Sequence, residues 1–498
     1  MKKINKILVA NRGEIALRVM RSAKEMGIKT VAIFSTADRE ALHVRFADEA
    51  VWIGEAPSAE SYLKGEAIIA ICQQLDVDAI HPGYGFLSEH ATFARQVAEA
   101  GLTFIGPSPE AIEVMGSKLA AKEAVSKFDV PLVPGTPSAI TDRAAAKKIA
   151  KEIGYPILIK ASAGGGGKGM RLVEKEEDFD EQMERAVSEA VSAFGDDSVF
   201  IEKYITSPKH IEIQILGDQA GNLVYLFERE CSIQRRHQKV IEEAPSAVLT
   251  PAVRQAMGDA AIKVAQACNY YNAGTVEFVM DEQLNFYFLE MNTRLQVEHP
   301  VTEMITGIDL VKEQIKIAQG ESLSFQQEDL QIRGHALEVR VYAEDPKNNF
   351  LPDIGQLKTY VRPQGLGVRV DDGFEQGMEI PIYYDPMIAK LVAFGKDRTE
   401  AIARMRRAIA EYKITGIETT LPFCDFVLGH EAFVSGKFDT NFVQKFFTPA
   451  SLQVTLTQEE IEVVSIVAAK LLEARQATTA QPSPNGVATT SNWRKNRV

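Results

Sequence analysis

The chain has 498 residues, of which 45% are hydrophobic and 25% charged, a composition typical of a globular protein. That length exceeds what one hydrophobic core supports, so we expect several domains. The 68 acidic residues outnumber the 55 basic ones and give a formal charge of -13, which disfavours binding to the phosphate backbone of nucleic acids. We therefore expect no nucleic-acid partner.

The cysteines and the apolar runs indicate the cellular compartment of the protein. The four cysteines lie far apart without a CxxC pair, which argues against a zinc cluster or a disulfide framework. The apolar run at residues 7–10 is too short for a signal peptide, and no run approaches the roughly 18 residues of a membrane span. We expect a cytoplasmic protein with reduced thiols and no membrane association.

The N-terminal part alternates short apolar runs with a helical pattern. Residues 7–10 and 30–34 are apolar and β-branched, and between them residues 14–26 repeat apolar positions at helical spacing. This order predicts a βαβ unit, and residues 79–80, before a glycine-rich exit, add another strand. We expect an α/β domain with an open, Rossmann-like sheet over residues 1–115.

From residue 116 onward the pattern is dominated by β-rich runs and polar turns. Such runs occur at residues 157–160, 199–203, 211–216 and 223–228, and sequential strands of this kind favour a mixed or antiparallel sheet. We expect a central domain over residues 116–332.

A third, β-containing domain is expected over residues 333–447, with strands at 336–343 and near Lys358 and Ile388, and a helix at 399–412. Residues 458–475 are an amphipathic helix candidate. Residues 476–498, rich in Ala, Thr, Ser, Pro and Asn, predict a flexible tail, so 448–498 form a helix-plus-tail segment.

Four glycines at residues 164–167 directly follow a predicted strand. Their backbone amides can close over phosphate oxygens, and Lys160 or Lys168 can add positive charge. The loop is not a Walker A motif, because Ser162 replaces its first glycine and Gly169 its final Ser/Thr. A hinged lid over a nucleotide is the preferred interpretation, and a mobile surface loop is the alternative.

Residues 275–280 and 285–292 are apolar runs joined by a polar turn, which predicts a hairpin. Because side chains alternate, Glu290 and Asn292 share one face, and Glu277 on the first strand can face them. Hard oxygen ligands on one face suit Mg²⁺ held with substrate phosphates. A single glutamate on a strand would otherwise be solvated surface.

The segment after the hairpin carries an anion-binding pattern. If extended, it would place Arg294, Gln296 and Glu298 on one side. Arg294 offers a planar fork for a carboxylate-shaped oxyanion, and Glu298 could act on its proton. An ordinary surface ion pair is the alternative.

A basic island at residues 231–240 lies beside acidic Glu242 and Glu243. In a chain of negative charge this island favours an anionic small molecule, and a solvated charged loop is the alternative.

Together these segments resemble the biotin carboxylase family of the ATP-grasp superfamily, from about residue 4 to about residue 447. The resemblance rests on five motifs in order, at residues 7–16 (ILVANRGEIA), 81–89 (HPGYGFLSE), 164–170 (GGGGKGM), 234–239 (QRRHQK) and 290–299 (EMNTRLQVEH). Five ordered motifs are far more specific than any one. The resemblance implies an α/β and α+β multidomain fold: a Rossmann-like N-terminal domain, a central ATP-grasp domain with a lid at about residues 131–204, and a β-rich C-terminal domain.

The resemblance also implies roles for the matching residues. The nucleotide contacts would be Lys118, Lys160, Gly166, Gly167, Glu202, Lys203, His210, Gln234 and His237. The ligands of Mg²⁺ or Mn²⁺ would be Glu277, Glu290 and Asn292. Bicarbonate would be bound by Lys239, Arg294, Gln296 and Val297, with Glu298 as its general base.

Arg340 would bind the biotin enolate, and a salt bridge to Glu338 or Glu344 is the alternative. For His210 and His237 the alternative is a structural histidine.

The implied activity is that of a ligase which carboxylates biotin through carboxyphosphate, using ATP and bicarbonate. None of the 13 Met is followed by Lys and then Met, so we expect the biotin on a separate biotin carboxyl carrier protein, beside a carboxyltransferase subunit. A homodimer is also implied. The final acceptor, whether acetyl-CoA, propionyl-CoA or pyruvate, would be chosen by the carboxyltransferase.

Two other functions stay open: another ATP-grasp carboxylate–amine ligase, and a nucleotide-binding subunit without turnover. The helix near the C-terminus could dock a partner or be an expendable extension.

Overall fold

The computed structural model describes residues 3–136, 140–161, 170–194, 197–453 and 458–478. The chain divides into two compact units, Met1–Pro449 and Ala450–Val498. The predicted divisions near residues 115 and 332 lie inside the first unit and stay predictions.

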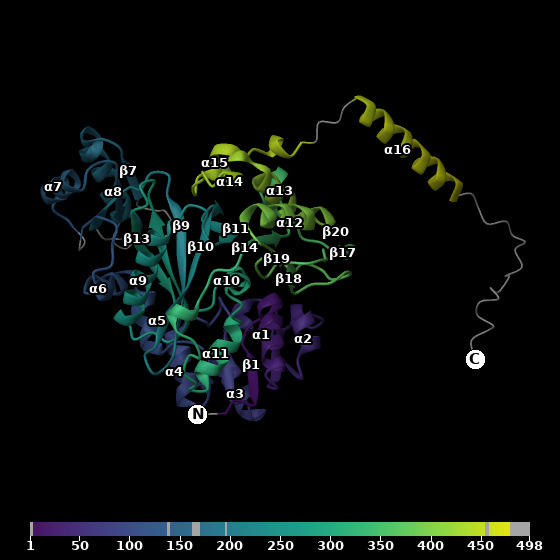
Figure 1. The fold of residues 1–498 in the computed structure, drawn as a ribbon, viewed down its shortest axis with the longest axis horizontal. Coiled ribbons are helices and arrows are strands. Elements are labelled where there is room, and N and C mark those ends of the chain that lie inside the picture. The colour runs from purple at the N-terminus through teal and green to yellow at the C-terminus, as the bar shows by residue number, and fades with distance from the viewer. Residues whose placement is uncertain (1–2, 137–139, 162–169, 195–196, 454–457, 479–498) are drawn as a thin grey trace, which may run out of the picture. The chain divides into compact units, whose positions relative to one another are not determined.

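An open parallel sheet begins the first unit (Figure 1). Its strand order is β3-β2-β1-β4-β5, from β1 (Lys6–Val9), β2 (Lys29–Ser35), β3 (Glu49–Gly54), β4 (Ala79–His81) and β5 (Thr103–Phe104). The helices are α1 (Gly13–Glu25), α2 (Leu42–Phe46), α3 (Gly65–Gln74), α4 (Ala91–Glu99) and α5 (Pro109–Gly116). Ile15, Val19 and Ala23 of α1 are buried in the core beside β1, so the predicted βαβ unit is confirmed.

A small three-stranded sheet follows, with the order β7-β6-β8. It consists of β6 (Ile157–Ala161), β7 (Met170–Val173) and β8 (Val199–Lys203), with helices α6 (Lys118–Ser126), α7 (Arg143–Ile153) and α8 (Phe179–Phe194) nearby in the chain. Ile157, Val199 and Phe179 belong to a separate hydrophobic core under this sheet. The glycines at 164–167, including the predicted phosphate contacts Gly166 and Gly167, lie outside the described residues.

The largest sheet is antiparallel and has the order β13-β12-β9-β10-β11-β14-β19-β18. Its strands are β9 (Lys209–Gly217), β10 (Leu223–Arg235), β11 (Gln238–Ala244), β12 (Asn272–Met280), β13 (Phe286–Asn292), β14 (His335–Tyr342), β18 (Val368–Asp372) and β19 (Met387–Gly395). The β11–β14 pairing joins the central segment to the C-terminal segment in one sheet. The four β-rich runs of the central segment were expected in one sheet. Two of them, β6 and β8, lie in the small sheet, and the other two, β9 and β10, lie in the large sheet.

Helices α9 (Pro251–Ala267), α10 (His299–Thr306) and α11 (Leu310–Ala318) pack on strands of the large sheet. Thr250 caps α9 by accepting a hydrogen bond from the Val253 amide, with Pro251 in the first turn.

The C-terminal part of the first unit adds short ribbons and helices. The ribbons pair β15 (Glu344–Asp345) with β16 (Leu351–Pro352), and β17 (Thr359–Val361) with β20 (Lys413–Thr415). The helices are α12 (Arg398–Glu411), α13 (Leu421–Gly429), α14 (Glu431–Val434) and α15 (Phe442–Phe446). Ala401, Met405 and Ala408 form the buried stripe of α12, and they belong to the same core as the apolar residues of β14 and β19.

The second unit contains helix α16 (Gln458–Thr478). The helix is longer than predicted, because residues 476–478, assigned to the tail, are helical, and the rest of that tail lies outside the described residues. Ile461 and Val463 are two positions apart and so project to nearly opposite sides, which makes the apolar surface wider than a single amphipathic stripe. Among the residues with described structure, no helix has the length and apolarity needed to cross a membrane.

Candidate active site

The carboxylate hairpin forms as predicted from alternation. Strands β12 and β13 are paired with Glu277 opposite Glu290 and Thr275 opposite Asn292, which places the three predicted metal ligands on one face. The Asn292 side-chain amide donates a 2.9 Å hydrogen bond to Glu277 Oε1. Burial raises the pKa of Glu290, and the neighbouring charge of Glu277 raises it further.

This donor set fits a hard divalent cation. Two carboxylates and an amide oxygen share one face, and Mg²⁺ prefers such oxygen ligands beside substrate phosphates. His210 and Glu212 could also reach a common ion with Glu277, but an imidazole suits softer metals better than Mg²⁺. Glu277, Glu290 and Asn292 would therefore hold the metal.

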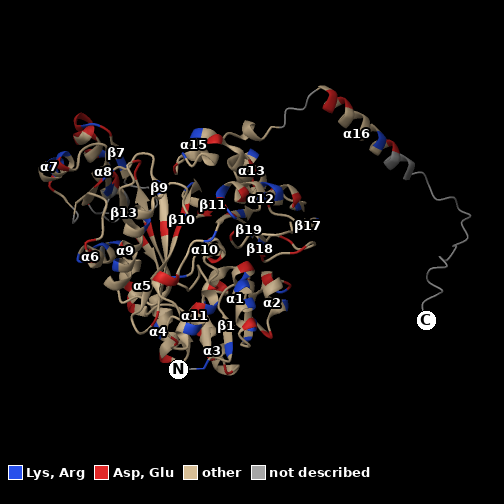
Figure 2. Ribbon diagram, in the orientation of Figure 1, with Lys and Arg blue, Asp and Glu red and all other residues tan. Residues whose placement is uncertain are grey.

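Lys239 on β11 lies at the centre of the acidic residues. Its ammonium donates to Glu212 at 2.5 Å, to Glu277 at 3.0 Å and to Glu298 at 2.6 Å. Figure 2 shows acidic residues on β9 and β10, in the middle of the sheet. Burial alone would lower the pKa of Lys239, but the three carboxylates outweigh it and hold the pKa well above its usual value. Lys239 is therefore a permanent cation beside the hairpin.

His210 is drawn into the same cluster, with its Nε2 atom 2.9 Å from Glu277. Burial would raise the pKa of Glu277, yet Lys239 and His210 together hold it well below its usual value. Glu277 is thus ionised and available to a metal.

Arg229 on β10 is a second buried cation that forms hydrogen bonds with residues of the site. The guanidinium is fully buried and donates to Glu212, Gln214, Thr275, Gln296 and Thr302. Its bond to Gln296 Oε1 measures 2.8 Å, and Gln296 in turn donates a 2.7 Å bond to Glu277. Arg229 thereby holds a predicted bicarbonate ligand in place.

The segment carrying Arg294, Gln296 and Glu298 is a loop, so the extended arrangement considered from the sequence does not occur. Glu89 contacts the start of this loop, where it accepts hydrogen bonds from the Thr293 amide at 3.0 Å and from Arg294 Nε at 2.8 Å. Arg294 also donates to Asn292 Oδ1 at 2.9 Å. The guanidinium is thus held beside the hairpin by a residue of the N-terminal part.

Glu298 ends this loop and has cations on both oxygens. Oε1 accepts from Lys239, and Oε2 accepts a 3.0 Å hydrogen bond from Arg340. Burial would raise the pKa of Glu298, but Lys239 and Arg340 outweigh it and hold the pKa well below its usual range. In this arrangement Glu298 is a weak base.

Arg340 pairs with Glu298 and with Glu242, whose Oε1 accepts a 2.7 Å bond from Arg340 Nε. The alternative partners considered from the sequence, Glu338 and Glu344, form no ion pair with Arg340 in the described structure. Glu344 pairs instead with Arg235 of the basic island, at 2.7 Å.

The remaining nucleotide candidates fall into two groups. Lys160 and Lys122 both donate to Glu202 of β8, with Lys122 at 2.5 Å. Lys203 donates to backbone carbonyls at the start of the small sheet.

Lys118 opens α6, close enough that its charge partly offsets the raised pKa of Glu290. Gln234 lies at the end of β10, where its side chain donates to the Cys231 carbonyl, and His237 is exposed in the β10–β11 turn. Val297 offers its carbonyl to Lys390 at 2.9 Å.

Five residues of the site were not predicted: Glu89, Lys122, Glu212, Arg229 and Glu242. Glu89 lies inside a quoted motif and Glu242 beside the basic island, so both had a signal. The sequence offered no signal for Arg229, Glu212 or Lys122, because a charged residue on a strand or helix is usually solvent-exposed.

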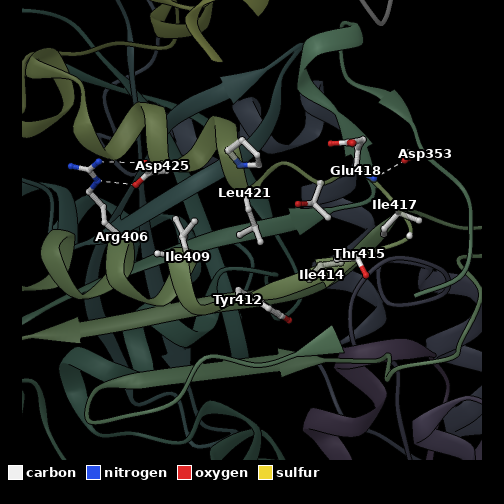
Figure 3. A pocket seen from close by; sticks show the side chains of 14 residues that line it. Asp353, Arg406, Ile409, Tyr412, Ile414, Thr415, Ile417, Glu418, Leu421 and Asp425 are labelled. Atoms are coloured by element: carbon white, nitrogen blue, oxygen red, sulfur yellow. Dashed lines mark hydrogen bonds and ion pairs between the residues drawn. The ribbon is translucent and has the colours of Figure 1, made fainter. Parts of the chain in front are cut away.

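A cavity of about 810 Å³ lies elsewhere, between α12, β20 and α13 (Figure 3). Arg406 and Asp425 form an ion pair at its wall. None of the predicted site residues that the structure describes lines it, and its lining does not offer the converging carboxylates and cations described above.

Family models match most of the chain. Residues 3–112 match the biotin carboxylase N-terminal domain, 117–326 the ATP-binding domain of the carbamoyl-phosphate synthase L chain, and 338–445 the biotin carboxylase C-terminal domain.

Relatives extend over nearly the whole chain. A pyruvate carboxylase subunit of Methanothermobacter thermautotrophicus is 50% identical over 473 residues, 95% of this chain and 96% of that protein. Biotin carboxylase 1 of Bacillus subtilis is 53% identical over 444 residues, 89% of this chain and 99% of that protein.

Solved structures of biotin carboxylase domains are also similar to this chain. The biotin carboxylase domain of a thermophilic 2-oxoglutarate carboxylase bound to bicarbonate is 48% identical, has a TM-score of 0.87, and is matched over 91% of this chain and all of that one. A dimer of this domain from Hydrogenobacter thermophilus, with MgADP, ADP and bicarbonate, has a TM-score of 0.82 at 48% identity, over 92% of this chain and all of that one.

Proposed function

Because this chain belongs to the biotin carboxylase family, we propose that it uses ATP and bicarbonate to carboxylate biotin carried by another protein. The observation that carries the proposal is the buried junction at which Lys239 bonds both Glu277 of the β12–β13 hairpin and Glu298, which in turn pairs with Arg340. These residues would supply anion-binding cations and a base next to a metal-binding face.

The chemistry has two difficult parts, because bicarbonate is a poor electrophile and the ureido nitrogen of biotin a poor nucleophile. ATP answers the first, since attack of bicarbonate on the γ-phosphate gives carboxyphosphate. Mg²⁺ held at the hairpin would offset charge on the phosphoryl oxygens. Lys239 and Arg294 would seat the bicarbonate, with Gln296 and Val297 beside them.

Glu298 would take the proton of bicarbonate. Its two cationic partners keep it a weak base, so substrate must compete for those partners. A bicarbonate anion competes with Glu298 for Lys239, and the biotin ureido oxygen competes for Arg340. We infer that both substrates raise the basicity of Glu298 on binding.

Carboxyphosphate can then release CO₂ beside biotin, and the departing phosphate can accept the ureido proton. Arg340 would stabilise the enolate-like anion of biotin. The nucleotide would lie between the small sheet and the large sheet, against Lys118, Lys160, Glu202, Lys203, His210, Gln234 and His237 with the loop that contains Gly166 and Gly167. Closure of that loop would keep water from the labile intermediate.

The partners proposed are a second copy of this chain, a biotin carboxyl carrier protein and a carboxyltransferase. One relative is named as a subunit of pyruvate carboxylase, and one solved relative is a dimer. The match to that pyruvate carboxylase relative covers 473 residues, more than the first unit holds, so it extends into the second unit. We infer that the second unit contacts another protein of the complex. Deleting residues 450–498 should abolish copurification of the carboxyltransferase, and an unchanged complex would contradict this.

The decisive experiment measures ADP release while bicarbonate and free biotin are titrated. We expect ADP release that requires bicarbonate and rises with biotin. An ATP-grasp ligase of another kind would be indifferent to biotin, and a protein without turnover would release no ADP. Either result would overturn the proposal.

A further inference from the structure

The residues behind Arg340 form a second, fully buried acidic pair. Glu242 on β11 lies directly opposite Glu338 on β14, and neither side chain is exposed. Residues opposite each other in an antiparallel pair have their Cβ atoms about 4.5–5.5 Å apart, and like charges there are destabilising. Two ionised carboxylates at this position would repel each other without solvent to screen them.

The two acids differ in their partners. Glu242 accepts the 2.7 Å hydrogen bond from Arg340 Nε and is ion-paired through it. Within the part of the chain that the structure describes, both carboxyl oxygens of Glu338 are buried without a hydrogen-bond partner, and so is Oε2 of Glu242. Glu242 is thus ion-paired with a cation, whereas Glu338 is not ion-paired in the described structure.

Lys390 is the cation that acts most strongly on Glu338, but in the described structure it is bonded to other groups. Lys390, fully buried on β19, is 3.2 Å from Glu14 and donates a 2.9 Å bond to the Val297 carbonyl. A buried carboxylate without a paired cation takes up a proton rather than remain charged.

The pKa directions agree with this distribution. Burial raises the pKa of Glu338 well above its usual value, and Lys390 only partly opposes the rise. Burial also raises the pKa of Glu242, but the bond from Arg340 limits the rise to about 7. Of the two acids, Glu242 therefore ionises first.

We propose that Glu242 is a positioning residue for Arg340, and that Glu338 is kept as the neutral acid so that the pair carries one negative charge. Glu242 holds the guanidinium by Nε and leaves Nη2 for Glu298 or for the ureido oxygen of biotin, while Nη1 donates a 3.5 Å bond to the Tyr342 hydroxyl. A charged Glu338 would compete with Glu242 for the same guanidinium. The proposal rests on the biotin carboxylase function given above.

Two isosteric substitutions at the paired positions test the proposal. Glu338→Gln replaces a neutral carboxyl with a neutral amide of the same shape, so kcat/KM for biotin should stay within about twofold. Glu242→Gln removes the charge that orients Arg340, and a hydrogen bond to a charged group corresponds to a loss of about ten- to hundredfold in kcat/KM for biotin. The loss should exceed any change in KM for ATP, because Arg340 faces biotin. Glu242→Asp keeps the negative charge and should therefore recover part of the lost kcat/KM for biotin.

The unfolding midpoint gives a readout that does not need activity. Glu242→Gln should lower it more than Glu338→Gln, because only the first change leaves a buried guanidinium short of a partner. Difference infrared spectroscopy of wild type against Glu338→Gln should also show a protonated-carboxyl band in wild type alone. If Glu242→Gln does not fold, Glu242→Asp against Glu338→Gln provides the same comparison.

Equal losses in the two Gln variants, or the absence of the infrared band, would overturn the proposal. A wild-type protein without biotin-dependent turnover would instead refute the proposed function, and the unfolding and infrared measurements would still decide the charge of Glu338.

Discussion

Replacing Glu298 with Gln tests the proposed base directly. The substitution keeps the shape of the side chain and removes its charge and basicity. Lys239 keeps Glu212 and Glu277 as partners and Arg340 keeps Glu242, so no buried cation loses its last carboxylate. The variant should therefore fold.

The expected loss follows from the role of a general base, which contributes about 10²- to 10⁴-fold to the rate. At about 1.36 kcal/mol for each tenfold change, this corresponds to about 2.7–5.4 kcal/mol of transition-state stabilisation. The proposed metal ligands on the hairpin and the lysines near Glu202 are untouched, so ADP affinity should change little.

The assay is bicarbonate-dependent ADP release with and without free biotin, with ADP binding measured by calorimetry. Glu228→Gln is a matched control, because Glu228 on β10 is as buried as Glu298 and pairs with Arg254 at 2.8 Å rather than with Lys239. Glu228→Gln should keep its turnover, whereas Glu298→Gln should lose it. Near-normal turnover in Glu298→Gln would remove this residue from the role of base.

Three further predictions address biotin, metal and acid stability. Arg340→Ala should reduce biotin carboxylation more than biotin-independent ADP release, and equal losses of both would argue against its contact with biotin. Glu290→Gln should raise the Mg²⁺ concentration needed for half-maximal activity severalfold, because the metal loses an anionic ligand; an unchanged Mg²⁺ titration would exclude Glu290 as a ligand. Burial lowers the pKa of His43 and of His81 from 6.5 to about 4, so as pH falls below 6.5 the unfolded chain binds protons that the folded chain does not. The free energy of unfolding should fall between pH 6.5 and 4 by up to about 3 kcal/mol per histidine, as measured by urea denaturation. His43→Gln should show a shallower fall, and an identical pH profile would contradict the assignment.

Local patterns in the sequence were enough to predict the elements whose structure depends on residues close in the chain. The βαβ order at the N-terminus follows from apolar spacing, because α1 must bury one stripe and β1 both faces. The shared face of Glu277, Glu290 and Asn292 follows from strand alternation across a short hairpin. The five ordered motifs were enough for the family, which the comparisons confirm.

The tertiary structure decided which distant charges meet. Arg340 reaches Glu242 and Glu298 only because β14 pairs with β11 across the boundary expected near residue 332, and no local periodicity encodes that pairing. Arg294 lies in a loop and is held there by Glu89, about 200 residues earlier in the chain. The physical reason is that alternation and helical spacing act over a few residues, whereas burial brings charges together from anywhere in the chain. Once water is excluded, each buried charge requires a partner or a proton, and that requirement sets the chemistry of the site.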